Sequence, residues 1–347
     1  MIPFVPSVRT LEAALRDLRH AKASVRRAAA ADLGRQAPEH QDRAVAALVA
    51  ALAPTTEPDA SVRAAAAESL AYLEDGAACA PLLAAAEGDQ DVHVRELAVM
   101  ALGALLRRSP GDESLLAYLS RALEDPEPRI RFQAVIAVAR AADRERAIAA
   151  LVAATDDDDP LVCHIALRMG EELGGEELPV PALVYERARR LLAHEAPVVR
   201  IAAAIVRARG GDKAATPLLV DVVEGRLATT EAEDEAAASE LAGELGVVAA
   251  RRGLERRAFG GAFGIGGDRY AWHARVALAR LGHARAIAWI RRDLRAFSRA
   301  RRTLAVAAAG RARLLDASPE LEAMQDDARR ADPDAVREAL ALLKSAV

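Results

Sequence analysis

One short pattern recurs along the whole chain. It begins with a polar or proline-containing turn, continues with Val-Arg and ends with an alanine-rich stretch near Leu-Gly. Clear copies are ASVRRAAAADLG from Ala23, ASVRAAAAESLA from Ala60, VHVRELAVMALG from Val92, PRIRFQAVIAVA from Pro128, PLVCHIALRMG from Pro160 and PVVRIAAAIVRARG from Pro197. Weaker copies start at Glu235, Trp272, Ala300 and Asp334. A repeat of this size buries its apolar face only by stacking on its neighbours, so the pattern predicts a tandem array.

Each repeat reads as two helices. The first has apolar residues at helical spacing, as in residues 44–53 and 147–155. A short turn such as Asp159-Pro160 follows, where Asp accepts hydrogen bonds from free helix N–H groups and Pro suits the first turn. No segment alternates with period two, so no sheet is expected. The sequence predicts an all-α fold, a right-handed α-solenoid of about ten helical hairpins over residues 1–347.

The composition suits such an array. Hydrophobic residues make up 52% of the chain but aromatic residues only 3%, so we expect closely packed helices with small residues at their contacts. Cys79 and Cys163 lie in different repeats, which favours a reduced, cytoplasmic setting. The N-terminus lacks the pattern of a signal peptide, and no run of 18 apolar residues exists, so we expect no membrane span. The richness in Ala and Arg is typical of a bacterial source.

The Val-Arg copies resemble the HEAT family, and in particular its short bacterial form, the PBS-lyase-like HEAT repeats. The family signature D-P-x-V-R-x-A-A-x-x-A-L-G is nearly complete around Arg26, Arg63, Arg95, Arg131, Arg200 and Arg337. The resemblance covers nearly the whole chain. It implies a curved superhelix whose second helices line the concave face, with each repeated Arg paired to an Asp of a neighbouring turn. Cys163 replaces that Arg in its repeat, so we expect the series to be broken between repeats 5 and 9.

Motifs for catalysis are scarce. The chain has no P-loop, no His-Glu-x-x-His and no paired Cys-x-x-Cys knuckles. Deoxyhypusine hydroxylase, built from similar repeats, uses several His-Glu pairs for iron, whereas this chain has only His194-Glu195, which reads as a helix-end pair. The acidic run 156–159 could bind a cation, but a solvated helix cap is favoured. We therefore expect no catalytic residues, no metal ligands, no cofactor and no enzymatic activity.

Charge divides the chain into three sections. Residues 1–250, assigned to repeats 1–7, have a net charge of −13; residues 251–313, assigned to repeats 8–9, have +13; residues 314–347, a C-terminal capping repeat, have −4. The basic section contains sixteen Arg and six of the eleven aromatic residues. It also contains the Gly-rich loop 260–267. Arg binds carboxylate and phosphate groups in a bidentate manner, and glycine permits close approach of the backbone.

These observations predict a partner-binding patch in the basic section. The Gly-rich loop and the helices beside it are expected to form one positive surface, with Phe263 and Trp272 near its centre. The residues assigned to this patch are Arg251, Arg252, Arg256, Arg257, Phe259, Phe263, Arg269, Tyr270, Trp272, Arg275, Arg291, Arg292 and Arg295. Two alternatives stay open: the patch is an ordinary solvated face, or its counter-charge comes from the acidic repeats of the same chain or of another copy.

Three functions follow in order of preference. The first is a non-catalytic scaffold or adaptor that binds an acidic segment of another protein through the solenoid surface. The second is a nucleic-acid-binding protein, with DNA repair as one form, since Arg-rich grooves bind phosphates. The third is an enzyme similar to the bilin lyases that give the repeats their name, for which no further motif is present. Self-association through opposite charges is a further prediction.

Overall fold

The computed structural model describes residues 9–175, 180–229, 231–260, 268–325 and 327–345, and these contain twenty α-helices and no strand. The chain contacts divide it into two compact units: unit 1 comprises residues 1–177 and 181–184, and unit 2 comprises residues 178–180 and 185–347. Each unit is an α-solenoid of stacked helical hairpins, which confirms the predicted fold class. The charge-based boundaries at 250 and 313 remain a prediction.

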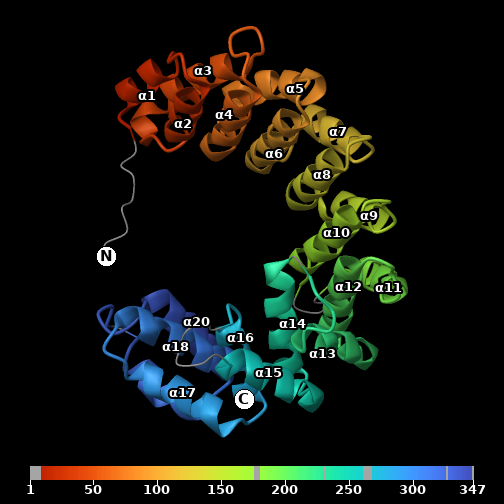
Figure 1. The fold of residues 1–347 in the computed structure, drawn as a ribbon, viewed down its shortest axis with the longest axis vertical. Helices are drawn as coiled ribbons and strands as arrows, with labels where there is room; N and C mark the ends of the chain where they lie inside the picture. Colours follow the sequence, from red (N-terminus) through yellow and green to blue (C-terminus); the bar gives the residue numbers. More distant parts are fainter. Residues whose placement is uncertain (1–8, 176–179, 230, 261–267, 326, 346–347) are drawn as a thin grey trace. The chain divides into compact units, whose positions relative to one another are not determined.

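Unit 1 contains five hairpins. Their helices are α1 (Leu11–Asp17), α2 (Ala23–Leu33), α3 (Gln41–Leu52), α4 (Ala60–Leu73), α5 (Cys79–Gly88), α6 (Val92–Arg108), α7 (Glu113–Ala122), α8 (Pro128–Ala141), α9 (Arg144–Ala154) and α10 (Pro160–Glu172). Figure 1 shows the even-numbered helices of this unit in one row and the odd-numbered helices in a second row. Every Val-Arg copy lies in an even-numbered helix, as the repeat predicts.

Helix α11 (Ala182–Leu191) crosses the division between the units. The other helices of unit 2 are α12 (Pro197–Arg209), α13 (Thr216–Val223), α14 (Ala232–Glu244), α15 (Arg251–Phe259), α16 (Ala271–Arg280), α17 (Ala284–Leu294), α18 (Arg299–Arg311), α19 (Ser318–Glu322) and α20 (Pro333–Lys344). Within this unit α14 packs on α16, and α18 packs on α20. The even-numbered helices are called second helices below.

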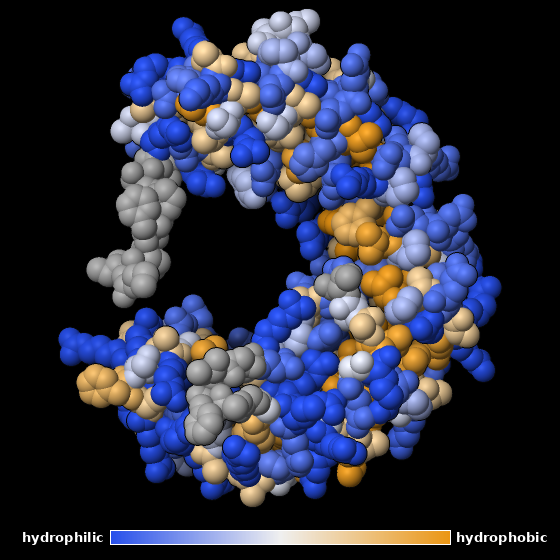
Figure 2. All heavy atoms as spheres, in the orientation of Figure 1, coloured by the Kyte–Doolittle hydropathy of each residue, from blue (hydrophilic) through white to orange (hydrophobic). Residues whose placement is uncertain are grey.

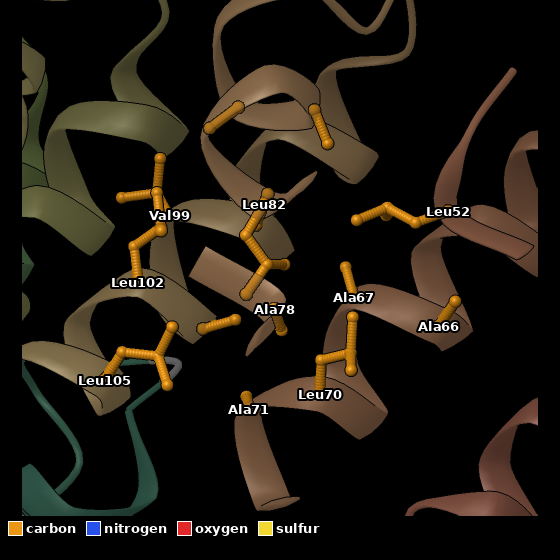
Figure 3. Packing of buried hydrophobic residues seen from close by; sticks show 14 of the residues in the cluster. Leu52, Ala66, Ala67, Leu70, Ala71, Ala78, Leu82, Val99, Leu102 and Leu105 are labelled. Atoms are coloured by element: carbon orange, nitrogen blue, oxygen red, sulfur yellow. The ribbon is translucent and has the colours of Figure 1, made fainter. Parts of the chain in front are cut away.

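The core lies between the two rows of helices and is built from leucine and alanine. In unit 1, Leu52 of α3, Leu70 of α4, Leu82 of α5 and Leu102 of α6 are buried and meet between the rows (Figure 3). Fully burying a leucine side chain contributes about 1.5–3 kcal/mol. Alanines fill the contacts between these leucines, which is why a chain with so few aromatic residues forms a dense core.

A glycine near the end of several second helices sets the distance to the next repeat. A Cβ placed on Gly103 of α6 would lie 2.6 Å from the Ala137 Cβ of α8. A Cβ on Gly243 of α14 would lie 2.5 Å from the Ala277 Cα of α16. Real Cβ atoms do not approach so closely, so the Leu-Gly end of the repeat reflects helix packing rather than a turn.

The repeated Arg forms a series of ion pairs between successive turns. Arg63 contacts Asp89 through two hydrogen bonds of 2.8 and 2.9 Å and also donates to the Glu57 and Pro58 carbonyls. Arg26 pairs with Glu57, and Arg131 with Asp157, in the same manner. These bidentate contacts fix each turn against the next repeat.

The series is interrupted at Cys163, where the sequence predicts, and also at Arg95, which among the described residues donates only to the Asp89 carbonyl. Cys163 occupies the Arg position of α10, and its Sγ lies 3.0 Å from the Asp157 carbonyl oxygen. Burial, the largest contribution, raises the pKa of the Cys163 thiol to about 11. The corresponding positions of α14 and α16 are Ala238 and Ala274, which offer no guanidinium. Arg302 of α18 resumes the position but donates to backbone carbonyls instead of a carboxylate.

Candidate binding surface

Two arginines and two aromatic rings come together where α15, α16 and α17 meet. Phe259 ends α15, and the guanidinium of Arg285 lies 4.1 Å from the centroid of its ring. Arg275 of α16 lies 4.6 Å from the Trp289 ring and 5.8 Å from the Phe259 ring. His283 stacks on Phe259 with 5.9 Å between centroids. We call these five residues the Phe259 cluster.

Local sequence explains how α17 supplies two members of the cluster. Arg285 and Trp289 are four residues apart in a helix, so their side chains lie on the same face. His283 precedes the helix and is its N-cap, accepting a hydrogen bond from the Ala286 N–H. Its Nε2 lies 3.2 Å from a Glu255 carboxylate oxygen, which orients the ring toward Phe259. Residues of α15, α16 and α17 therefore hold the cluster together.

The guanidiniums of the Phe259 cluster are not held in ion pairs within the described part of the chain. The Arg275 Nε donates to the Ala258 carbonyl at 2.9 Å, and burial lowers its pKa from the ordinary value. Among the described residues, no carboxylate forms an ion pair with Arg275 or Arg285. Arg285 is exposed, and cation–π contacts of this kind contribute about 0.5–2 kcal/mol while leaving N–H groups free. The arrangement can accept a carboxylate or a phosphate.

Several arginines predicted for the patch are engaged internally. The Arg257 side chain is only 10% exposed; it pairs with Glu235 at 2.9 Å and donates to the Val222 and Val223 carbonyls. A carboxylate oxygen of Asp268 lies 3.6 Å from the Arg257 guanidinium. Arg257 therefore joins α13, α14 and α15 and is unavailable to a partner.

Three of the four arginines of α17 and its C-terminal turn contact acids of the same unit. Arg291 contacts Asp316, and Arg295 lies 3.1 Å from Glu320. Arg292 lies 2.9 Å from the buried Asp293, which immediately follows it. The counter-charge available in unit 2 thus includes the flanking repeats, since Glu235 precedes the basic section and Asp316 and Glu320 follow it. All three of these arginines remain more than half exposed.

The remaining patch residues differ in their surroundings. Arg251 and Arg256 donate to the Leu281 and Glu224 carbonyls at 2.9 and 2.8 Å. Arg252 is exposed on α15. Exposed Arg269 lies 4.8 Å from the ring of the buried Tyr270, and burial raises the pKa of that tyrosine. Carbonyl contacts leave the positive charge of Arg251 and Arg256 uncancelled.

Trp272 belongs to a second group that lies on the second helices. Its ring packs edge-on against His273, and Arg311 of α18 lies 5.5 Å from its centroid. Both His273, at 2.7 Å, and Arg311, at 3.0 Å, contact Glu240 of α14. Burial acts to raise the pKa of Glu240, but these two contacts outweigh it, so its pKa lies below the ordinary value.

The sequence singled out Trp272 but missed the partners that it meets in space. Glu240, His273 and Arg311 come from three consecutive second helices, and only the repeat register would have aligned them. Phe263, the other expected centre of the patch, lies outside the described residues. Figure 2 shows hydrophilic residues over much of the visible surface around α15 to α18.

Two other candidates from the sequence have structural roles. Asp159 caps α10 through the Leu161 N–H at 2.8 Å, and Asp157 pairs with Arg131, which confirms the cap interpretation of the acidic run. The His194 and Glu195 carbonyls both accept hydrogen bonds from Arg200 at 2.7 Å. Within the described ranges, no three His, Cys, Asp or Glu side chains are placed to hold a metal ion.

None of the helices in the described part of the chain is long and apolar enough to cross a membrane. Cys79 and Cys163 are both free thiols.

Comparison with known proteins identifies the repeat. Residues 8–103 and 79–170 match the family model described as HEAT repeats. Among solved structures, YibA of E. coli has 16% identity and a TM-score of 0.51, covering 80% of this chain and 93% of that one. The CpcE–CpcF complex of phycocyanin lyase from Nostoc sp. PCC7120 has 20% identity and a TM-score of 0.37, covering 83% and 96%.

Kap121p bound to Nup53p has 13% identity and a TM-score of 0.48, and the match covers 97% of this chain and 40% of that one. At these identities the similarities concern the fold alone. A comparison with curated proteins finds no match.

Proposed function

Because this chain is a HEAT-repeat protein, we propose that it is a non-catalytic scaffold that binds an acidic segment of a partner protein through unit 2. HEAT solenoids are typical of protein-interaction scaffolds. The observation that carries the proposal is the Phe259 cluster, in which Arg275 and Arg285 lie against aromatic rings and form no ion pair with any described residue. Other arginines of the basic section are already paired with acids of neighbouring repeats.

The chemistry of the cluster favours a carboxylate beside an apolar group. Guanidinium N–H groups form strong, charge-assisted hydrogen bonds with carboxylates, and the half-buried rings of Phe259 and Trp289 offer apolar contact. Buried aromatic residues and Arg are also the usual centres of protein interfaces. Exposed Arg252 and Arg256 on α15 extend the positive surface for further acidic residues.

The proposal is tested by direct binding of defined probes. One probe is a fluorescein-labelled peptide of alternating Glu and Leu, and the other is a labelled single-stranded DNA of similar net charge. Fluorescence anisotropy at several salt concentrations measures both affinities. We expect the peptide to bind more tightly than the DNA. Arg285→Gln should weaken peptide binding by roughly tenfold or more, since a hydrogen bond to a charged group contributes about 1.5–3 kcal/mol.

Arg313→Gln is the matched control, because it removes the same charge from an exposed site at the end of α18. It should leave peptide affinity within about twofold, as single exposed charges contribute little. Equal losses in both variants would show that the peptide senses only net charge and would contradict the assignment of the cluster.

Nucleic-acid binding is the second candidate function. Carbonyl-bound arginines such as Arg251 and Arg256 retain charge that phosphates could use. Tighter binding of the DNA probe, with an affinity that falls steeply with salt, would favour this function over the first. An enzyme similar to the bilin lyases is the third candidate, and no sequence motif described above points to that activity.

A further inference from the structure

The turn between α17 and α18 presents an isolated aromatic side chain to solvent. Phe297 at this turn is fully exposed, whereas burying a phenyl ring normally contributes about 1.5–3 kcal/mol. Its backbone is nevertheless held: the Arg302 guanidinium donates to the Ala296 carbonyl at 2.6 Å and to the Phe297 carbonyl at 2.8 Å. The ring therefore projects from a fixed turn, which lowers the entropy lost when it enters a pocket.

Exposed arginines lie around this ring. The same Arg302 guanidinium also donates to the Arg329 carbonyl at 2.9 Å, so the turn before α20 lies beside the turn of Phe297. The arginines at 329 and 330 are exposed. Arg295 and Arg299 flank Phe297 in sequence; they pair with Glu320 and Asp332, but their side chains are still 76% and 52% exposed. This edge of unit 2 combines an apolar anchor with positive charge.

The corresponding edge of unit 1 has the complementary character. A cavity of about 550 Å³ opens at the N-terminal ends of α6, α8 and α10. Its apolar wall consists of Pro128, Phe132 and Leu161, and Leu161 is 48% exposed. Glu96, Glu127 and Asp159 supply three carboxylates to the same cavity, against one guanidinium from Arg129 and the ring of His93.

We propose that the Phe297 turn of one copy of this chain docks into the α6–α8–α10 cavity of a second copy. The phenyl ring would contact Phe132 and Leu161, and the exposed arginines around it would face the carboxylates around the cavity. The two sides match in hydrophobic and charge character: an exposed ring would meet an apolar wall, and an arginine-rich edge would meet the carboxylates of the cavity. Such a contact joins two different surfaces, so each end of an assembly keeps a free anchor or a free cavity unless the assembly closes on itself.

This inference goes beyond the proposed function and uses a different surface. Neither Arg275 nor Arg285 takes part in it. Loss of peptide binding in Arg285→Gln and loss of self-association in Phe297→Ala are therefore separate outcomes. Each proposal can fail without the other.

Sedimentation velocity of the full-length protein tests the docking. At low salt, the mean mass should increase between about 5 and 200 µM protein, because a weak protein–protein contact has a Kd on the order of micromolar or above. About 0.5 M NaCl should reduce it, because salt screens exposed charges. Phe297→Ala should weaken association by roughly tenfold or more, as expected for an interface anchor. Val248→Ala, which truncates a 65% exposed residue of another turn, should leave association unchanged.

A mixing experiment identifies the partner surface. Leu161→Arg places a positive charge at the cavity and should also give a monomer. A mixture of the Phe297→Ala and Leu161→Arg proteins retains one intact anchor and one intact cavity, so it should form dimers and nothing larger. Far-UV circular dichroism verifies that both variants are folded.

A wild-type protein that remains monomeric at 200 µM would overturn the proposal. So would unchanged association of the Phe297→Ala protein. A third outcome also contradicts the proposal: the wild type associates, both variants lose association, and their mixture forms no dimer. In that case the Phe297 ring would dock somewhere other than in this cavity.

Discussion

Replacement of Gly103 by alanine tests whether close helix contact sets the spacing of the repeats. The added methyl group would lie 2.6 Å from the Ala137 Cβ and 3.2 Å from the Ala137 Cα, so α6 and α8 must separate. Overpacking of this kind costs about 1–3 kcal/mol. Alanine has a higher helix propensity than glycine, which offsets about 1 kcal/mol. Because the overlap includes the Ala137 Cα as well as its Cβ, we take the upper part of the overpacking range, about 2–3 kcal/mol, and expect a net loss of stability of about 1–2 kcal/mol.

Thermal and urea unfolding of the full chain, followed by far-UV circular dichroism, measures this loss. For a domain of this size, 1 kcal/mol corresponds to roughly 2–4 °C in Tm, so the expected decrease is about 2–8 °C. Gly88→Ala is the matched control, since its Cβ would meet nothing within 4 Å at the end of α5. That variant should be unchanged or more stable by up to about 1 kcal/mol.

A double-mutant cycle separates the steric effect from helix propensity. Ala137→Gly removes the methyl group nearest to Gly103 and alone should destabilise by about 2 kcal/mol, through lost burial and lower propensity. The Gly103→Ala, Ala137→Gly protein should be about 1–2 kcal/mol more stable than the sum of its single changes. Strict additivity, or a Gly103→Ala protein as stable as the parent, would refute the packing argument.

The remaining predictions concern ion pairs, acid and thiols. Asp89→Asn should destabilise by about 3–5 kcal/mol because it leaves the buried Arg63 unpaired, whereas Glu74→Gln, at an exposed pair, should cost under about 1 kcal/mol; urea midpoints compare the two. Burial acts to raise the pKa of Asp89, but the hydrogen bonds and charge of Arg63 outweigh burial, so the pKa of Asp89 lies below its ordinary value. Its stabilisation is therefore complete above the unfolded pKa of about 4 and lost as the pH falls through the lower folded value, which an acid titration of ellipticity measures. Cys163 should react with a thiol reagent at pH 8 only in urea, because its folded pKa is raised to about 11 and the side chain is buried; prompt reaction of the native Cys163 would contradict this.

The sequence predicted most of the fold because the repeat links one position to the next. Val62 and Val94 share a register, so each marks a second helix, and both helices are present where expected. Asp91 and Asp159 cap helices because a short carboxylate side chain just before a helix can accept hydrogen bonds from the free N–H groups of its first turn. The interruption at Cys163 was also visible, since a thiol cannot replace a guanidinium in a bidentate pair.

The site was less predictable because charge along the sequence does not reveal pairing in space. Arg285 and Arg291 look alike in the sequence, yet only Arg291 meets an acid, Asp316 of the next repeat. Arg291 and Asp316 are 25 positions apart, and Arg311 and Glu240 are 71 positions apart. Such contacts depend on side-chain direction as well as on the repeat register. Trp272 was assigned to the patch by proximity in sequence, but its neighbours in space are His273 and Arg311.

The scarcity of aromatic residues gives the two units different optical properties. Both tryptophans, Trp272 and Trp289, lie in unit 2, and unit 1 contains none. Intrinsic tryptophan fluorescence therefore reports on unit 2, whereas ellipticity at 222 nm reports on the helices of both units. Unfolding curves from the two signals would coincide if the solenoid melted as one cooperative block. Separate midpoints would reveal a partly folded species without any added label.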